Sequence, residues 1–168
     1  MTSRGLRALE AHLAGCPAPV YLAPQPLVEA IAGYKFHRGA LAAADRAPLP
    51  DLAAVAGNAA LLVLVEGVND HENLGALFRN AAAFGAGGVV LDPTTADPLY
   101  RRSVRVSMGH VLRLPYTRIP EWPGGISRLR DLGFEVLALT PATDAQDLAT
   151  VPRRPKQALL VGAEGSGL

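Results

Sequence analysis

From residue 58 onward, short apolar runs of strand length alternate with stretches of helical pattern. The runs are LLVLVE at 61–66, GVVLD at 88–92, VLRLPYTRI at 111–119, FEVLALT at 134–140 and the start of QALLVGAEGSGL at 157–168. Nearly continuous apolar strands that alternate with helices are typical of a parallel sheet covered by helices. The sequence therefore predicts an α/β fold with a mostly parallel sheet and helices on both faces.

The stretch NLGALFRNAAAFG, residues 73–85, is the clearest helix. Four apolar residues recur in it at helical spacing and form one stripe, namely Leu74, Leu77, Phe78 and Ala81. Asn73 stands where an N-cap belongs and Gly85 where a C-terminal cap belongs. Arg79 lies off the apolar stripe, so packing does not require it. We expect its side chain to lean back toward the helix start, where one substrate group could contact Arg79 and Asn73.

The first 56 residues divide poorly into elements. Three are expected: a helix marked by Leu6, Leu9 and Leu13, a strand at 20–23, and a helix at 26–33 with Pro at its start. A Pro-bounded linker follows, and we place the main boundary near 48–57. The chain is thereby divided into an N-terminal part, 1–56, and a main domain, 57–168.

Composition excludes several classes of protein. A net charge of +1 gives no global field that attracts nucleic acid, so such binding needs a local patch. The single cysteine, Cys16, excludes an internal disulfide and a cysteine-based zinc cluster. No apolar run approaches the ~18 residues of a membrane span, and the N-terminus has no signal-peptide core. These features predict a cytoplasmic protein with no membrane partner, and we expect no metal.

Three loops converge if the sheet is parallel, because ligands bind at the carboxyl ends of the strands. They are the loop before Asn73, the loop at 140–141 and the glycine turn at 162–168. The glycines of that turn let backbone amides approach an anion or an adenosine group. Glycines alone equally suit a connection without a ligand, since GxGxxG and GxxxxGK[ST] are both absent. Glu164 in this turn fits a ligand contact or a solvated position equally well.

Arginines cluster between residues 101 and 131, where seven stand against Glu121 and Asp131. Three of them share one side of a helix expected at 97–109, namely Arg101, Arg102 and Arg105. Arginine forms bidentate contacts with phosphate, so a phosphate or RNA surface is one interpretation, and a solvated surface is the other. His37 and Arg38 in FHRGALA are a second phosphate-directed candidate, with a polar pair at a helix start as the alternative.

Two of these stretches together resemble the SpoU/TrmH-type RNA 2′-O-ribose methyltransferases of the SPOUT class. NLGALFRNAAAFG resembles the first motif of that family, and LLVGAEGSGL resembles its second motif, GxEGxG after a strand. The similarity extends over about 61–168 and includes DPLYRRSVRVSMG and FEVLALTP. FHRGALA resembles the join between the family's small RNA-binding domain and its catalytic domain. Residues 1–56 are then a partial RNA-binding domain with its linker.

The resemblance implies a sheet whose C-terminal part is threaded into a trefoil knot, bound S-adenosylmethionine, and a homodimer that methylates a ribose 2′-hydroxyl of tRNA or rRNA. The implied catalytic residues are Asn73, Arg79 and Glu164. The implied cofactor-binding residues are Leu139, Thr140, Gly162, Gly165 and Leu168. The implied RNA-binding residues are His37, Arg38, Arg101, Arg102 and Arg105. An arginine is normally protonated, so Arg79 is assigned to phosphate positioning and to stabilisation of the developing alkoxide, with direct action as a base as the alternative.

Family members continue into a third motif, an Ile-Pro-Met turn and a Ser-Leu-Asn helix, and this sequence stops before it. We therefore expect a methyltransferase domain that is truncated at its C-terminus. Two other interpretations stay open at this point. One is a non-catalytic RNA-binding remnant of such an enzyme. The other is an unrelated small-ligand α/β enzyme, which a different strand order would favour.

Overall fold

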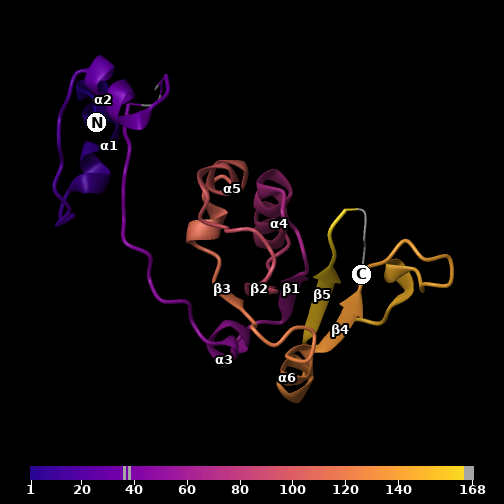
Figure 1. Ribbon diagram of the computed structural model, residues 1–168. Helices are drawn as coiled ribbons and strands as arrows, with labels where there is room; N and C mark the ends of the chain where they lie inside the picture. The colour runs from indigo at the N-terminus through magenta and orange to yellow at the C-terminus, as the bar shows by residue number, and fades with distance from the viewer. Residues whose placement is uncertain (36, 38, 165–168) are drawn as a thin grey trace. The chain divides into compact units, whose positions relative to one another are not determined.

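In the part of the chain that the structure describes, residues 1–35, 37 and 39–164 of a computed structural model, five strands form one fully parallel sheet. Their order is β3-β2-β1-β5-β4 (Figure 1). The strands are β1 (Leu61–Val65), β2 (Gly88–Leu91), β3 (Tyr116–Arg118), β4 (Glu135–Ala138) and β5 (Gln157–Val161). In register, Val63 of the central strand pairs with Val89 on one side and Leu159 on the other. The predicted parallel α/β fold is confirmed.

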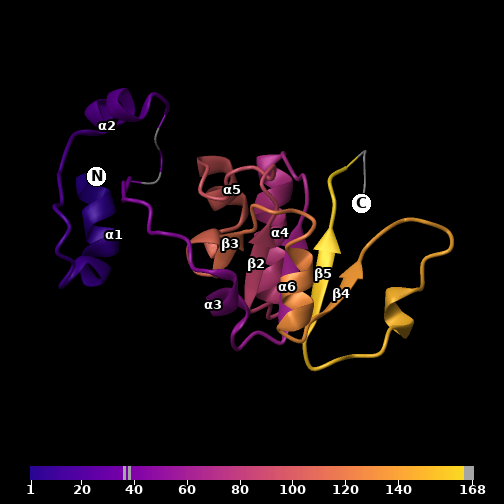
Figure 2. The ribbon, with the colours of Figure 1, turned by 60° about the horizontal axis from the view of Figure 1, so that its bottom comes forward.

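Helices pack on both faces of this sheet (Figure 2). One face meets α4 (His71–Ala83), α5 (Arg101–Val106) and the short helix η1 (His110–Leu112), with Leu74, Phe78 and Val111 buried against it. The other face meets α3 (Leu52–Ala56) and α6 (Ile126–Asp131) through residues such as Val55 and Leu129. A second short helix, η2 (Leu148–Thr150), lies in the loop between β4 and β5. Alternate side chains of each strand supply the two cores, as the pleat of a strand requires.

The chain divides into two compact units, Met1–Ala47 and Pro48–Leu168. The first contains α1 (Ser3–Leu13) and α2 (Gln25–Ala32), the two helices expected there. The expected strand at 20–23 is wrong, because this segment is irregular. The boundary falls at the first residue of the expected 48–57 stretch, since α3 packs into the core of the second unit. Sequence inspection had taken α3 for part of a linker.

Three expected elements of the second unit differ in their bounds. Asn73 is not the N-cap of α4, because the Asp70 carboxylate caps that helix and accepts hydrogen bonds from the backbone N–H groups of Glu72 and Asn73. Gly85 does follow the helix with a positive φ of 74°. The helix expected at 97–109 is limited to α5. The strand expected at 111–119 is limited to β3, because η1 and Pro115 precede it.

Candidate functional site

A cavity of about 260 Å³ lies between α4 and the end of β5. Four residues of α4 at helical spacing form one wall, namely Asn73, Ala76, Leu77 and Asn80. Val68, Val161, Gly162 and Glu164 complete the lining. The cavity thus sits at the carboxyl ends of β1 and β5, where ligands bind in open parallel sheets. Its lining joins apolar side chains to two amides and one carboxylate, the usual composition of a small-molecule site.

Asn73 and Glu164 meet in this cavity although 91 residues separate them in sequence. The Asn73 Nδ2 amide donates a hydrogen bond of 3.0 Å to Glu164 Oε1. Because Asp70 provides the helix cap, the Asn73 side chain is available for this contact. Both loops were expected to converge from the strand pattern, and the hydrogen bond brings two of the three expected catalytic residues together.

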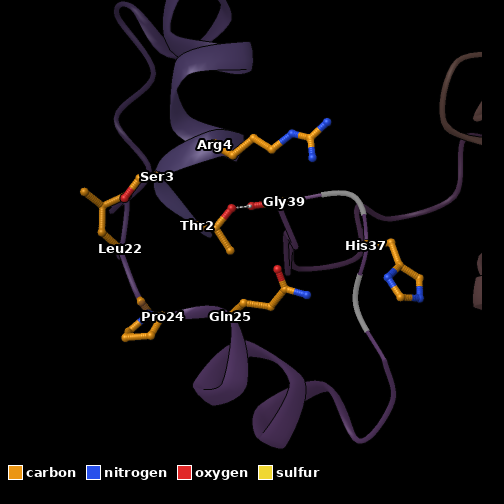
Figure 3. Close-up of a pocket in the computed structure, with 9 residues that line it drawn as sticks. Thr2, Ser3, Arg4, Leu22, Pro24, Gln25, His37 and Gly39 are labelled. Carbon is orange, nitrogen blue, oxygen red and sulfur yellow. Dashed lines mark hydrogen bonds between the residues drawn. The ribbon is translucent and has the colours of Figure 1, made fainter.

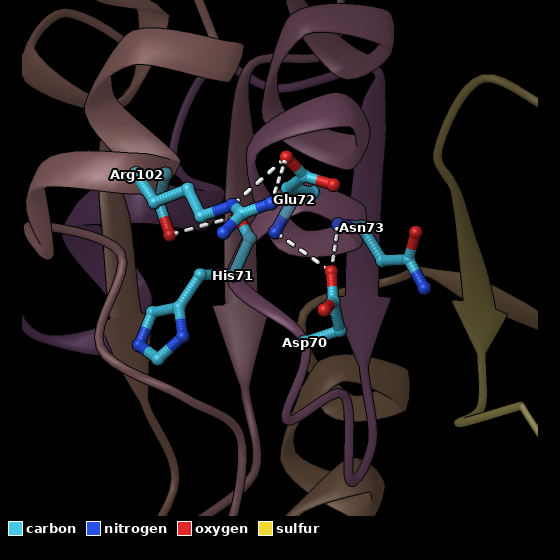
Figure 4. A network of polar contacts seen from close by, with 6 residues as sticks. Asp70, His71, Glu72, Asn73 and Arg102 are labelled. Atoms are coloured by element: carbon cyan, nitrogen blue, oxygen red, sulfur yellow. Dashed lines mark hydrogen bonds and ion pairs between the residues drawn. The ribbon is translucent and has the colours of Figure 1, made fainter.

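The first turn of α4 directs its polar side chains to different sides (Figure 4). Asp70 Oδ1 accepts from the N–H groups of Glu72 and Asn73, at 2.8 Å each. The hydrogen bond from Asn73, together with that from Glu72 and the charge of Arg102, lowers the pKa of Asp70 below its ordinary value. Glu72 Oε1 accepts from Arg102 Nε at 2.8 Å, on the side of α4 that faces α5. The turn therefore presents Asn73 to the cavity and Glu72 to the arginines.

Arg79, the third expected catalytic residue, is exposed and does not line the cavity. It follows Glu72 by seven residues, almost two helical turns, so the two side chains leave α4 on the same side. Arg102 and Arg105 lie one turn apart on α5, and Arg102 is paired with Glu72. Arg79, Arg102 and Arg105 therefore belong to one side of the α4–α5 pair, which we call the arginine side.

Of the expected cofactor residues, one lines the cavity, two follow β4 and do not line it, and two are outside the described residues. The Leu139 N–H donates to the Leu160 carbonyl at 2.9 Å and continues the ladder between β4 and β5. Thr140 is exposed, and its hydroxyl accepts from the Ala142 N–H at 3.3 Å. Neither of the two lines the cavity. Gly162 does line it, whereas Gly165 and Leu168 lie outside the described residues.

The arginine cluster divides into surface and structural members. Arg101, Arg102 and Arg105 are exposed on α5, which fits both a phosphate surface and a solvated one. Arg118 is half-buried, and its guanidinium donates to the backbone carbonyls of Asp92 and Ala96. Arg118 therefore fixes the loop after β2.

The same loop is held by a buried carboxylate. Asp92, only 3% exposed, accepts hydrogen bonds from the Thr94 hydroxyl and the Thr95 N–H at 2.5 and 2.7 Å. Burial by itself raises the pKa of Asp92, but hydrogen bonds from Thr94, Thr95 and the Gly67 N–H outweigh it and lower the pKa below its ordinary value. Asp92 and Arg118 thus fix the backbone that leads into α5.

A second cavity, of about 470 Å³, lies within the N-terminal unit (Figure 3). His37 and Arg4 are among its lining residues, together with Thr2, Gln25 and Gly39. The Thr2 hydroxyl donates to the Gly39 carbonyl at 3.3 Å and ties the start of α1 to this loop. His37 therefore lines the same cavity as a second basic side chain, Arg4, in a lining of mixed polar and apolar residues. Arg38, the other expected residue of this pair, lies outside the described residues.

Sequence inspection missed Asn80 and Leu77 as cavity residues and Asp70 as the helix cap. Asn80 stands seven residues after Asn73, so helical spacing alone could have placed both on one side of α4. Leu77 had been assigned to the apolar stripe of the helix, and it lies at the edge of that stripe, where core and cavity meet. Asp70 carries the same signal as Asn73, since both residue types are good helix caps.

Two kinds of feature are absent from the part of the chain that the structure describes. Among residues 1–35, 37 and 39–164, no three His, Cys, Asp or Glu side chains gather closely enough to hold a metal ion. Over the same residues, every helix is too short or too polar to cross a membrane.

A family model described as the SpoU rRNA Methylase family matches residues 60–168. An uncharacterised tRNA/rRNA methyltransferase of Mycobacterium tuberculosis is 47% identical over 171 residues, which cover 99% of this chain and 59% of that protein. One of Archaeoglobus fulgidus is 34% identical over 107 residues, which cover 64% of this chain and 47% of the relative. The chain thus spans little more than half the length of the mycobacterial relative.

Two solved structures share the fold. The SpoU methyltransferase AviRb from Streptomyces viridochromogenes, in complex with AdoMet, is 27% identical, with a TM-score of 0.64 over 72% of this chain and 50% of that one. An AdoMet-bound rRNA methyltransferase from Sinorhizobium meliloti has a TM-score of 0.78 over 99% of this chain and 64% of that one, at 23% identity. The second likeness concerns the fold alone.

Proposed function

The chain belongs to the SpoU rRNA methylase family, and we propose that it serves to transfer a methyl group from S-adenosylmethionine to a ribose 2′-hydroxyl of tRNA or rRNA. The observation that carries this proposal is the hydrogen bond between Asn73 and Glu164. It joins the two stretches whose order and separation resemble the family's motifs, and it does so at the mouth of a cavity.

The cavity suits part of a nucleoside cofactor. Leu77 and Val161 offer apolar surface to an adenine ring or a thioether chain, and Glu164 and Asn80 offer groups that can bind hydroxyls or an ammonium. At Gly162 no side chain separates the backbone from the cavity, so its amide can approach a ligand closely. We assign the cofactor to these residues, together with Leu139 and Thr140 after β4 and with Gly165 and Leu168.

In the proposed reaction, S-adenosylmethionine supplies an electrophilic methyl group on a positively charged sulfur. The ribose 2′-oxygen would bond to the methyl carbon while the carbon–sulfur bond breaks and S-adenosylhomocysteine leaves, and the hydroxyl proton would pass to solvent. Groups that stabilise the developing negative charge would lower the barrier. Glu164 holds the Asn73 amide in place through the 3.0 Å hydrogen bond and so fixes the cavity wall. We therefore assign Asn73 and Glu164 to the part of the cavity where the reaction takes place, with Glu164 holding the Asn73 side chain in position.

Arg79 has a different part in this proposal. Its exposed position on the arginine side suits contact with an RNA phosphate beside the reacting ribose. A permanently charged guanidinium also stabilises a nearby alkoxide without accepting a proton. Arg101, Arg102 and Arg105 extend the same phosphate surface along α5, and His37 with Arg38 provides a second one in the N-terminal unit. Because the methyl group is accepted by a ribose 2′-hydroxyl, which DNA lacks, the substrate is RNA and not DNA.

The proposal is tested by calorimetric titration of the protein with S-adenosylmethionine, followed by incubation with radiolabelled cofactor and unmodified tRNA or rRNA transcripts. We expect measurable cofactor binding and label in alkali-resistant dinucleotides, because a 2′-O-methyl group blocks cleavage of the adjoining phosphodiester. Label that is released as a methylated base would contradict the ribose assignment. Binding of RNA without binding of the cofactor would favour the non-catalytic RNA-binding alternative.

We also propose a homodimer. Three large apolar side chains of the second unit are strongly exposed, namely Phe84, Met108 and Leu112, at 81%, 78% and 66%. Burial of such side chains against another protein surface would be favourable. Light scattering of the purified protein decides the matter: a mass of about one chain at micromolar concentration would contradict the dimer.

A further inference from the structure

His71 and Tyr100 form an aromatic pair at the N-terminal ends of α4 and α5. Their ring centroids lie 4.2 Å apart, with 43° between the ring planes. Tyr100 is 54% exposed, so much of its ring faces solvent although His71 covers part of it. A large ring left this open contributes less to stability than a buried one, so packing explains only part of its placement.

The backbone on both sides of this pair is fixed. The His71 carbonyl accepts a hydrogen bond of 3.0 Å from the Ser103 hydroxyl, which is fully buried. Tyr100 is the N-cap of α5, and its carbonyl accepts from the Val104 N–H at 3.1 Å. The rings are therefore carried by two helix starts that are tied to each other, and ordering them for a ligand costs little further entropy.

The pair adjoins both parts of the proposed site. His71 stands two residues before Asn73 in the first turn of α4, so the aromatic pair and the cavity lie on different sides of one helical turn. Glu72 and Arg102 form the ion pair next to it. Arg79 and Arg105 are exposed on the same side, and within the described residues neither forms a hydrogen bond or an ion pair. The helix pair that carries the rings thus also carries two exposed cations that have no partner among the described residues.

We propose that His71 and Tyr100 form a stacking platform for a nucleobase of the RNA substrate, with Arg105 and Arg79 on the adjoining phosphates. Single-stranded nucleic acid is bound by this combination of aromatic faces for bases and basic side chains for the backbone. His71 precedes Asn73 by two residues, about 3 Å along the axis of α4, so a base held here would bring the RNA to the turn that carries Asn73. The platform is a positioning device that aligns the ribose. The inference rests on RNA being the substrate of the proposed function.

The test measures RNA binding without cofactor, by fluorescence anisotropy with two labelled 12-nucleotide probes. One is a random-sequence RNA pool, and the other is an abasic ribose-phosphate strand of the same length. We expect the unchanged protein to prefer the base-bearing probe. Tyr100→Leu should weaken binding of that probe about fivefold to a hundredfold and leave binding of the abasic strand unchanged, because stacking needs bases. Tyr100→Phe keeps the ring and should bind like the unchanged protein.

Arg105→Ala serves as the contrasting variant, because loss of a phosphate contact weakens both probes alike and lowers the salt dependence. Equal affinity of the unchanged protein for both probes, or no affinity for either, would overturn the platform. So would a Tyr100→Leu protein that loses both probes equally while its thermal unfolding is unchanged. This experiment measures RNA binding and no methyl transfer, so it is independent of the test of the proposed function. Cofactor binding and ribose methylation could be observed even if the platform were refuted.

Discussion

The two sides of α4 differ in chemistry. The side that faces the cavity carries Asn73, Ala76, Leu77 and Asn80, small or neutral side chains next to a glycine turn. The arginine side carries Glu72 and Arg79 and adjoins Arg102 and Arg105 on α5. A neutral, partly apolar wall suits a nucleoside cofactor, whereas exposed guanidinium groups suit phosphates. In the proposed function, the cofactor contacts one side of α4 and the RNA contacts the other, and the first turn of the helix borders both.

The largest effect is expected from a change on the arginine side that leaves the cavity intact. Arg79→Ala should lower methyl transfer by at least about a hundredfold, the typical loss when a group that stabilises developing charge is removed. The affinity for S-adenosylmethionine should stay unchanged, because Arg79 does not line the cavity. Single-turnover kinetics and calorimetry measure the two quantities. Arg128→Ala, an exposed arginine of α6 on the opposite face of the sheet, is the matched control. Near-normal turnover of Arg79→Ala would remove its assigned role.

A change on the cavity side should weaken binding of the cofactor and leave binding of RNA unchanged. Glu164→Ala removes the acceptor of the Asn73 amide and a charged group of the cavity lining. We expect the dissociation constant for S-adenosylmethionine to rise about tenfold, the order expected for one hydrogen bond to a charged group. The affinity for RNA should not change. Glu121→Ala, an exposed glutamate of the opposite face, controls for loss of charge. Unaltered cofactor affinity would argue against the cavity as its site.

The third prediction concerns the stability of the fold. The arginine side is formed by α4 and α5 together, so it depends on the close packing of these two helices. A Cβ added at Gly75 would lie 2.8 Å from the Ser103 carbonyl oxygen and 2.9 Å from the Val106 Cβ. Gly75→Ala should therefore lower the free energy of unfolding by about 1–3 kcal/mol, the usual cost of overpacking. Gly57→Ala, whose added Cβ would meet nothing closer than 3.4 Å, should change it little. Urea unfolding followed by circular dichroism compares the two. Equal stabilities would mean that the helices separate at little cost.

The smallest effect concerns the loop that leads into α5. The lowered pKa of Asp92 means that its carboxylate stabilises the fold above its ordinary pKa of 3.8 and that this contribution is lost as the pH falls through the lowered value. Asp92→Asn should therefore be less stable by about 1 kcal/mol at neutral pH. The gap should narrow in acid, where the unchanged protein loses its carboxylate charge. Thermal unfolding between pH 7 and pH 3 measures it. A gap of constant size over this range would contradict the assigned cause.

The sequence allowed the sheet to be predicted because its strands are nearly continuous apolar runs, and the convergence of Asn73 with Glu164 followed from parallel strands alone. The N-cap could not be predicted as readily, because Asn73 and Asp70 are both good capping residues and only the backbone path chooses between them. α3 was missed because it has only five residues, which are too few to show a helical repeat of apolar side chains. Arg118 had been counted with the surface arginines, although its partners are backbone carbonyls that carry no sequence signal.

The position of Arg79 is the most instructive of these differences. The lean of helical side chains toward the N-terminus suggested that Arg79 and Asn73 could contact one group. Six residues of helix also rotate the side chain by more than half a turn, which places Arg79 with Glu72 on the arginine side. The direction in which the Arg79 side chain leaves the helix therefore matters more than its distance from Asn73 along the axis. The cavity brings together Asn73, Gly162 and Glu164, whereas Arg79 is not among its lining residues.

The division of α4 into a cofactor side and an RNA side is tested most directly by backbone amide NMR of the protein, titrated first with S-adenosylmethionine and then with a single-stranded RNA. We predict that the cofactor shifts the resonances of Asn73, Leu77, Asn80, Gly162 and Glu164, and that RNA shifts those of His71, Arg79, Tyr100, Arg102 and Arg105. Two ligands that shift one common set of amides, or a cofactor that shifts only residues of the N-terminal unit, would contradict it.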